Sequence, residues 1–195
     1  MGHREKLLAG AKRCLYERGY GRTTARDIVE VSGTNLASIG YHFGSKEALL
    51  NAAMMESIED WGAELERVLR ADADADADAN PMERFESMWA RVIESFAAHR
   101  PALAASFEAF TQAEHSPELR QQLADAHEEV RPWFATLFQK MESTADEGSV
   151  RAVGSFHLAL LNGLMVQWLL DPERAPSGRE MADALRTILT SVQST

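Results

Sequence analysis

The stretch "TTARDIVEVSGTNLASIGYHFGSKEALL", residues 23–50, decides the fold. Its apolar residues recur at helical spacing, and the breaks between them fall at residues that begin or end helices. Thr24, with Asp27 three residues further on, predicts the start of a helix, and Gly33 predicts its end. Asn35 predicts the cap of a short helix that follows. Two short helices joined by a tight turn predict a helix-turn-helix arrangement.

The second of these helices, expected from Asn35 to about His42, carries small residues on one side. Ala37 and Gly40 lie one turn apart on it. A glycine inside a helix costs about 1 kcal/mol relative to alanine, so a demand other than helix stability must explain Gly40. The major groove of B-DNA, roughly 12 Å wide, admits a helix whose exposed side chains are small. We therefore interpret this helix as one that approaches DNA closely.

Hydrogen-bond donors and positive charges flank the helix pair. Phosphate groups are commonly bound by such donors at helix ends, and basic side chains add electrostatic attraction. The candidates for phosphate contacts are Thr24, Tyr41, His42 and Lys46, with Arg22 and Arg26 as additional cations. The alternative is that these helices serve packing alone, with Phe43 in the core and His42 capping a helix end.

Helical spacing of apolar residues continues along the rest of the chain, so the expected fold class is all-α. Ser45 is expected to cap a long fourth helix, and Pro81 to open the next one, which ends near His99. A separate helix is expected from Pro101 to about Ser116. Further helices are expected from Pro117 with a kink at Pro132, over 149–170 and over 177–193. The repetitive run "ADADADADAN" (71–80) is expected to be a solvated loop, and "STADEG" (143–148) a connector.

Charge divides the chain into two parts. The formal net charge is −10, yet the first 50 residues hold eight basic and five acidic residues, and the remainder holds 12 basic and 25 acidic ones. This asymmetry suggests two halves with different partners. The one cysteine, Cys14, excludes an internal disulfide and is expected to be a buried thiol. No signal peptide and no long uninterrupted apolar run are seen, so we expect a cytoplasmic protein with no membrane span.

Residues 7–50 resemble the DNA-binding domain of the TetR family of transcriptional regulators. The matching elements are "ERGY" (17–20), "TTARDI" (23–28), the turn glycine at position 33 and "YHFGSKEALL" (41–50), followed by a long helix. The resemblance implies an all-helical, homodimeric, ligand-responsive regulator that is usually a repressor. It also implies a DNA-binding domain at 1–46 and a ligand-binding and dimerisation domain at 47–195.

The resemblance assigns roles to individual positions as well. Thr24, Tyr41, His42 and Lys46 match the phosphate contacts of the family. The recognition helix carries Asn35, Leu36, Ala37, Ser38 and Gly40, and Thr34 in the turn completes the predicted DNA-binding set. Two positions depart from the family pattern, because Thr34 stands where valine is usual and Gly40 where a larger residue is usual. Both departures concern which bases are read.

The second half contains no short motif, and its aromatic residues are the main signal. Rings contributed by several helices can line a cavity for an apolar or planar ligand, although ordinary core packing is the alternative. The predicted ligand-binding residues are Trp61, Phe85, Trp89, Phe96, Phe107, Phe110, Trp133, Phe134, His157 and Trp168. The polar candidates inside or beside this cavity are His99, Glu108, His115, His127 and His157. His157 lies on an apolar face, where a buried core histidine is the alternative.

The apolar segment 149–170 needs a partner because it is hydrophobic on more than one face. Small residues at Gly154, Ser155, Ala159 and Gly163 recur at near four-residue spacing and permit close helix approach. With 177–193, this segment is expected to pair with its twofold mate in a four-helix interface. The sequence therefore predicts a homodimer.

The leading function hypothesis is a dimeric repressor that binds a palindromic site in double-stranded DNA and is released by a small apolar or aromatic effector. The rival hypothesis is a small-molecule binding or carrier protein with a vestigial DNA-binding domain. An enzyme is not expected, because no nucleophile–base pair, metal set or phosphate loop is found in the sequence. No cofactor and no metal are expected.

Overall fold

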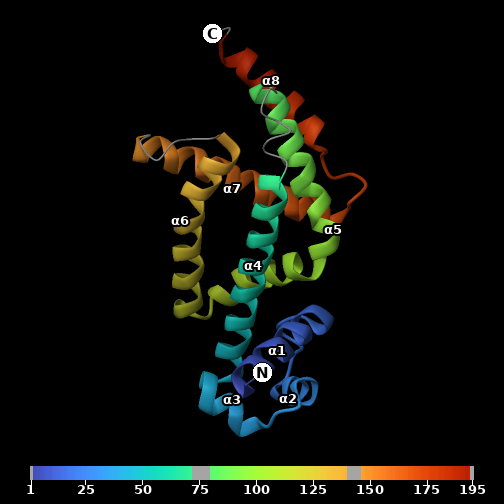
Figure 1. Cartoon of the computed structure of the whole chain (residues 1–195), viewed down its shortest axis with the longest axis vertical. Helices are drawn as coiled ribbons and strands as arrows, with labels where there is room; N and C mark the ends of the chain where they lie inside the picture. Colours follow the sequence, from blue (N-terminus) through green and yellow to red (C-terminus); the bar gives the residue numbers. More distant parts are fainter. Residues whose placement is uncertain (1, 72–79, 140–145, 194–195) are drawn as a thin grey trace. The chain divides into compact units, whose positions relative to one another are not determined.

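The computed structural model describes residues 2–71, 80–139 and 146–193. Within these ranges the chain forms eight helices and no strand, which confirms the all-α class (Figure 1). The helices are α1 (His3–Arg18), α2 (Ala25–Ser32), α3 (Leu36–Phe43), α4 (Lys46–Ala71), α5 (Pro81–Ala113), α6 (Pro117–Gln139), α7 (Glu147–Leu170) and α8 (Gly178–Gln193). Residues 72–79 of the predicted loop and 143–145 of the predicted connector lie outside the described residues, and α7 begins at Glu147, two residues earlier than the sequence predicts.

The chain divides into two compact units. The first contains residues up to Gly62 together with His99–Leu123, and the second contains Ala63–Ala98 and the residues from Ala124 onward. The expected boundary at residues 46 and 47 is a division by function, and it stays a prediction. The packing shows that α4, α5 and α6 each contribute to both units.

The core of the first unit joins the three N-terminal helices to parts of α4, α5 and α6. Leu7 and Cys14 of α1, Ile28 of α2 and Leu49 of α4 are fully buried in it, which confirms the buried thiol. Ala109 of α5 is fully buried in the same core. The packing of α1 against α2 and α3 therefore fixes the helix pair at 24–43 on a continuous apolar base.

The second unit is assembled by close approaches at glycines. A side chain at Gly154 of α7 would collide with the backbone carbonyl of Arg131 in α6, and one at Gly178 of α8 would lie 2.5 Å from the carbonyl oxygen of Glu86 in α5. Both glycines are buried. These contacts explain why α7 and α8 carry glycine at positions where alanine would favour the helix.

One helix boundary was predicted wrongly. The sequence predicts two helices that end near His99 and begin at Pro101, whereas α5 runs without a break from Pro81 to Ala113. Proline removes one backbone hydrogen bond from a helix but does not always end it. Here buried apolar residues on both sides of Pro101, including Phe96 and Leu103, hold the helix together.

Among the described residues, α7 is the one helix long and apolar enough to be a candidate membrane span. An 18-residue window in it has a mean hydropathy of 1.4, and 28% of that window is buried. Its length and composition would suit a membrane span, but a helix packed on neighbouring helices in a soluble protein has the same character. Exposed apolar side chains on α7, such as Phe156 at 46% and Leu170 at 81%, show that this chain alone leaves the helix partly uncovered.

Candidate nucleic-acid interface

Helix α2 begins with the capping box that the sequence predicts. The Thr24 hydroxyl accepts a hydrogen bond from the Asp27 backbone N–H, and the Asp27 carboxylate accepts one from the Thr24 N–H at 2.8 Å. The hydrogen bonds from Thr24 lower the pKa of Asp27, which also pairs with Arg18 at 2.7 Å. The helix start is thereby fixed next to Arg22 and Arg26, which are both exposed.

The turn to α3 is made by Gly33, which has a φ of 62° and a ψ of 31°. Only glycine adopts this left-handed conformation without strain. Asn35 then caps α3, because its side-chain oxygen accepts a hydrogen bond from the Ser38 N–H at 3.0 Å. Helix α3 ends at Phe43, one residue later than predicted, and Gly44 follows with a φ of 82°.

The outer side of α3 is exposed, and Ala37 and Gly40 on it carry little or no side chain. Leu36 is 52% exposed, Ala37 is exposed, and a Cβ built on Gly40 would meet no atom within 4 Å. Tyr41 is 86% exposed, and its ring packs edge-on against His42 with ring centroids 4.9 Å apart. Since nothing in the chain crowds Gly40, packing does not explain the glycine.

Three residues of the predicted DNA-binding set are held by other parts of the chain. Ser38 is only 8% exposed and bonds to Asn35, and the Thr34 hydroxyl lies 2.7 Å from that of Ser32. The Lys46 ammonium donates to the Thr23 carbonyl at 3.2 Å. Lys46 therefore ties α4 to the residue that precedes the Thr24 cap. The buried position of Ser38 removes it from the surface that could meet DNA.

The turn between α1 and α2 is anchored by α5, which the sequence did not reveal. The Glu108 carboxylate accepts a hydrogen bond from the Tyr20 backbone N–H, 88 residues away in sequence. Gly19, with a φ of 80°, allows this approach, because a Cβ there would lie 2.7 Å from a Glu108 carboxylate oxygen. The Tyr20 hydroxyl donates to Asn51 of α4 at 2.8 Å. This turn leads directly into the segment that carries Arg22 and Thr24.

Part of the predicted ligand-binding set forms one group in the second unit. We name Phe85, Trp89, Phe134, Phe138 and His157 the ring cluster. Phe138 stacks on His157 with ring centroids 4.6 Å apart, and Trp89 lies 5.2 Å from Phe138 and 6.0 Å from His157. Both Trp89 and His157 are fully buried, and burial lowers the pKa of His157 to about 4. Phe138 belongs to the cluster although the sequence did not single it out as a ligand residue.

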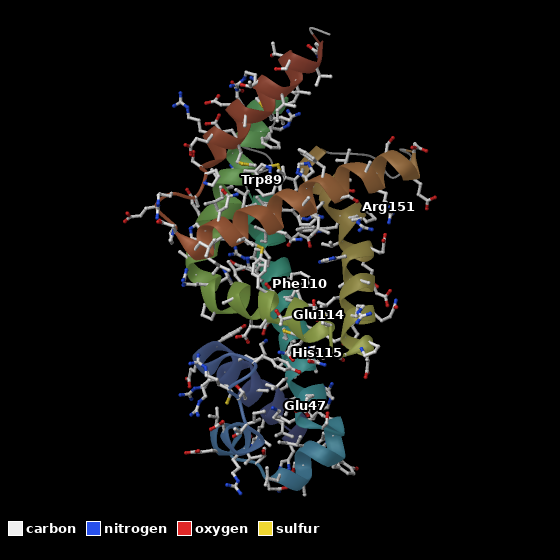
Figure 2. All side chains as sticks on the ribbon, turned by 180° about the vertical axis from the view of Figure 1, so that it is seen from behind. Glu47, Trp89, Phe110, Glu114, His115 and Arg151 are labelled. Atoms are coloured by element: carbon white, nitrogen blue, oxygen red, sulfur yellow. The ribbon has the colours of Figure 1, made fainter. Side chains whose placement is uncertain are left out.

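The other predicted ligand residues are spread over both units. Phe96 packs against Trp168, and Trp133 packs edge-on against Phe134, all in the second unit. Trp61, Phe107 and Phe110 belong to the first unit. The polar candidates are divided as well, with His99, Glu108 and His115 in the first unit and His127 in the second. Trp89 of the ring cluster and Phe110 of the first unit are labelled in Figure 2.

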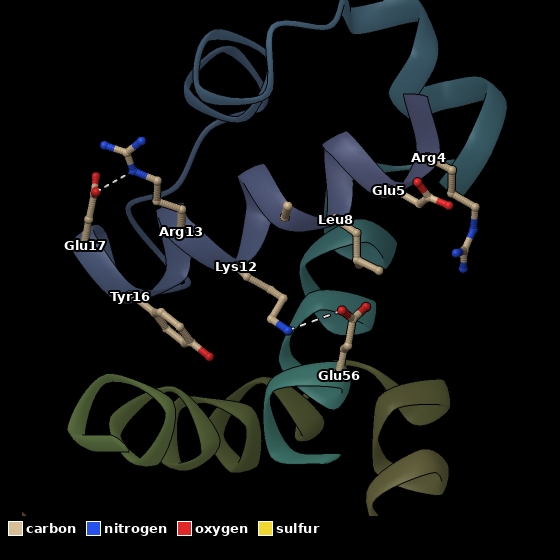
Figure 3. A pocket seen from close by; sticks show the side chains of 9 residues that line it. Arg4, Glu5, Leu8, Lys12, Arg13, Tyr16, Glu17 and Glu56 are labelled. Carbon is tan, nitrogen blue, oxygen red and sulfur yellow. Dashed lines mark hydrogen bonds and ion pairs between the residues drawn. The ribbon is translucent and has the colours of Figure 1, made fainter. Parts of the chain in front are cut away.

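A surface hollow of about 670 Å³ lies on α1 and α4, and none of the predicted ligand residues lines it (Figure 3). Lys12 bonds there to Glu56 at 3.2 Å and also to Asp60. Burial lowers the pKa of Lys12, but the hydrogen bonds that its ammonium donates to Asp60 and Glu56, together with the charges of these two carboxylates, outweigh burial, so that the pKa lies above its usual value. The hollow is lined by Arg4, Glu5, Leu8, Ala9, Lys12, Arg13, Tyr16, Glu17 and Glu56. These ion pairs tie α1 to α4.

A capped helix, a left-handed glycine turn and a second helix with an exposed, thin outer side define a helix-turn-helix DNA-binding protein. Comparison with known families agrees with this class. The family model "Bacterial regulatory proteins, tetR family" matches residues 7–53, and "Tetracyclin repressor-like, C-terminal domain" matches residues 80–191. The chain belongs to the TetR family, as the sequence resemblance indicated.

Two known regulators and one solved structure show how similar this chain is to individual proteins. The transcriptional repressor AcnR of Corynebacterium efficiens is 42% identical over 53 residues, which are 27% of this chain and 28% of that protein. The regulator TtgR of Pseudomonas putida is 24% identical over 177 residues, which are 87% of this chain and 81% of that protein. The structure of the multidrug binding protein EbrR with proflavin shares the fold, with a TM-score of 0.67, 19% identity and coverage of 95% of this chain and 99% of the other.

Membership in the family settles the broad function. The protein is a transcriptional regulator that binds DNA, and TetR-family regulators are not enzymes. Regulators of this family bind DNA and small-molecule effectors.

Proposed function

We propose that the protein is a ligand-responsive repressor that binds a palindromic operator as a homodimer and releases it when a small apolar or aromatic effector binds. In this proposal residues 1–46 bind DNA, residues 47–195 bind the effector and form the dimer, and the protein acts in the cytoplasm. The repressor role is supported by the name of AcnR, whose similarity covers the DNA-binding part of this chain.

The exposed outer side of α3 is the observation that carries the proposal. Ala37 and Gly40 present little bulk, and the larger side chains of Leu36 and Tyr41 beside them are 52% and 86% exposed. Such a helix can enter a major groove while Arg22, Thr24, Arg26 and His42 approach the flanking phosphates. Lys46 acts in the same region by holding Thr23, so its contribution combines positive charge with support of the turn.

The homodimer is supported by exposed apolar side chains on the last two helices. On α7, Phe156, Val166 and Leu170 are 46%, 40% and 81% exposed. On α8, Ile188, Leu189 and Val192 are 59%, 46% and 70% exposed. An obligate interface of this kind buries roughly 2,000 Å² or more. A second copy that covers 149–170 and 177–193 would remove these side chains from water.

Release requires that the effector bind the DNA-free conformation more tightly than the DNA-bound one. In a dimer that reads two half-sites, a small change in the separation of the two recognition helices is enough to lose register with adjacent major grooves. The second unit supplies the apolar environment for such an effector, and the bound proflavin in EbrR shows that a protein of this fold holds an aromatic ligand.

Selection of binding sites from random duplex DNA tests the proposal. The purified full-length protein should enrich a palindrome whose half-sites lie about one helical turn, or a multiple of it, apart. Tyr41→Ala should abolish the enrichment, whereas Tyr16→Ala, a change of an exposed tyrosine on α1, should leave it intact. A protein that enriches no sequence yet still binds small aromatic molecules would instead be the carrier protein of the rival hypothesis.

A further inference from the structure

The ring cluster contains a buried hydrogen-bond donor for which the described residues supply no acceptor. The indole Nε1 of Trp89 is buried and has no hydrogen-bond partner among the described residues. Trp89 is fully buried between Phe85, Phe138 and His157. A buried donor without an acceptor destabilises the folded protein, so the structure should contain a reason for it.

A second buried donor lies on the same side of α6 as the cluster rings. The guanidinium Nε of Arg131 is buried and makes no hydrogen bond within the described structure. Arg131 precedes Phe134 and Phe138 by three and seven residues, so all three share one face of the helix. Its backbone carbonyl touches Gly154 of α7, three residues before His157. Arg131 therefore borders the ring cluster at the contact of α6 with α7.

The groups at this site favour a hydrogen-bond acceptor over a cation. Burial is the cause of the low pKa of His157, whereas a carboxylate beside the ring would raise it. Glu128, the nearest acidic partner of Arg131, is shared with Arg151, and hydrogen bonds from both arginines lower its pKa to about 2. The pKa of His127 is lowered too, mainly by burial and to a smaller extent by the positive charge of Arg131. Arg131 and Glu128 form an ion pair of no net charge, so the preference for an acceptor comes from the two buried donors, the Trp89 indole N–H and the Arg131 Nε–H.

We propose that the effector is a planar aromatic molecule that bears a hydrogen-bond acceptor and no positive charge, and that it enters the ring cluster and accepts the Trp89 indole N–H. A carboxylate on that molecule would be held by Arg131. The assignment rests on the proposed function, since it names the effector class for the release step.

The rings of the cluster already pack against one another, so a ligand that enters the cluster must separate them. An aromatic ligand replaces ring–ring contacts by ring–ligand contacts of the same kind, so the exchange itself is nearly balanced. The net gain then comes from the hydrogen bond that Trp89 cannot make in the empty protein. Loss of the N–H should therefore weaken ligand binding without weakening the fold.

Isothermal titration of the full-length protein with two naphthalene probes of opposite charge tests the assignment. The probes are 2-naphthoate and 2-naphthylmethylammonium, which share the ring and differ in the charged group. We expect 2-naphthoate to bind at least tenfold more tightly than the ammonium probe. Equal or tighter binding of the ammonium probe, or no binding of 2-naphthoate at millimolar concentration, would overturn the assignment.

Variants separate the proposed contacts from general packing. Trp89→Phe keeps the ring and removes the donor, so 2-naphthoate should bind about tenfold more weakly while the melting temperature stays equal or rises. Arg131→Gln should weaken binding of 2-naphthoate similarly, whereas Arg151→Gln, a change of the exposed arginine on the same carboxylate (Figure 2), should not. Unchanged affinity in both Trp89→Phe and Arg131→Gln would contradict the assignment.

These titrations contain no DNA, so their outcome is separate from that of operator selection. If the protein binds 2-naphthoate through Trp89 but selects no operator, the effector site is supported and the proposed repressor function is contradicted. If the protein selects an operator but its binding of 2-naphthoate does not depend on Trp89, the repressor function is supported and this effector class is contradicted.

Discussion

At the residue scale, Gly40 is where helix stability and DNA binding make opposite demands. Beyond the backbone of α3 itself, no atom of the described residues lies within 4 Å of a Cβ at this position, so packing within the protein does not require glycine. Glycine costs a helix about 1 kcal/mol relative to alanine. Close approach of the α3 backbone to DNA is the explanation that we favour.

Gly40→Ala should therefore raise the free energy of unfolding by up to about 1 kcal/mol and weaken operator binding. Gly62→Ala, at a second uncrowded helical glycine in α4, is the matched control and should leave DNA affinity unchanged. Denaturant unfolding and fluorescence anisotropy with a labelled duplex measure the two effects. If Gly40→Ala binds the operator as well as the wild type does, close approach is not the reason for the glycine.

His157 makes stability depend on pH. Its folded pKa is about 4, below the ordinary value of 6.5, so the unfolded chain binds the proton more readily. The free energy of unfolding should therefore increase with pH between about 4 and 6.5, by on the order of 3 kcal/mol over that window. As the pH falls through this window the stabilisation is lost, because the unfolded chain is protonated and the folded protein is not. Urea unfolding at a series of pH values measures this slope. In His157→Phe the slope over the same window should become markedly smaller; an equal slope would show that other groups cause it.

At the element scale, the turn between α1 and α2 depends on α5. Glu108 accepts the Tyr20 N–H and fixes the segment that presents Arg22 and Thr24. Loss of a hydrogen bond to a charged acceptor costs about 1–3 kcal/mol. We expect the loss to appear as a less ordered turn and hence as weaker DNA binding.

Glu108→Ala should lower both the melting temperature and the operator affinity, whereas Glu108→Gln, which keeps an acceptor oxygen, should restore most of the affinity. Glu114→Ala is the control, because Glu114 is exposed just beyond the end of α5 and its loss changes the net charge equally (Figure 2). Removal of a negative charge by itself should strengthen DNA binding slightly. A Glu108→Ala protein that behaves like Glu114→Ala would show that the turn does not need this contact.

The elements that the sequence predicted correctly are those determined by near neighbours. The Thr24–Asp27 capping box, the Gly33 turn and the Asn35 cap each involve residues within a few positions of one another, and each is confirmed. The break at Pro101 was predicted wrongly because distant packing keeps α5 continuous. The Glu108–Tyr20 contact spans 88 residues and has no local signal.

The candidate ligand residues show the same limit. Aromatic content predicts a ring-lined cavity for a ligand, which stays a prediction; in the structure five rings pack against one another in the second unit. Composition could not indicate that Phe107 and Phe110 lie in the first unit or that Phe138 joins the cluster. Those assignments depend on how α5 and α6 pass from one unit to the other.

At the scale of the whole molecule, the proposed homodimer should depend on the apolar side of α8. Ile188→Glu places a charge among exposed apolar side chains that a second copy would cover, so the variant should be monomeric at micromolar concentration. Thr187→Glu, at an exposed position beside it, is the control for the added charge. Sedimentation velocity measures the state. A wild type that sediments as a monomer would contradict the proposed interface.

Operator binding as a function of salt concentration tests the central claim most directly. If Arg22, Arg26 and Lys46 of two copies meet phosphates, about six counterions are released, and the logarithm of affinity should fall against the logarithm of salt concentration with a slope of about −5. Fluorescence anisotropy with the selected duplex and effector-free protein gives this slope. A flat dependence, or no binding to any duplex at low ionic strength, would contradict a phosphate-anchored helix in the major groove.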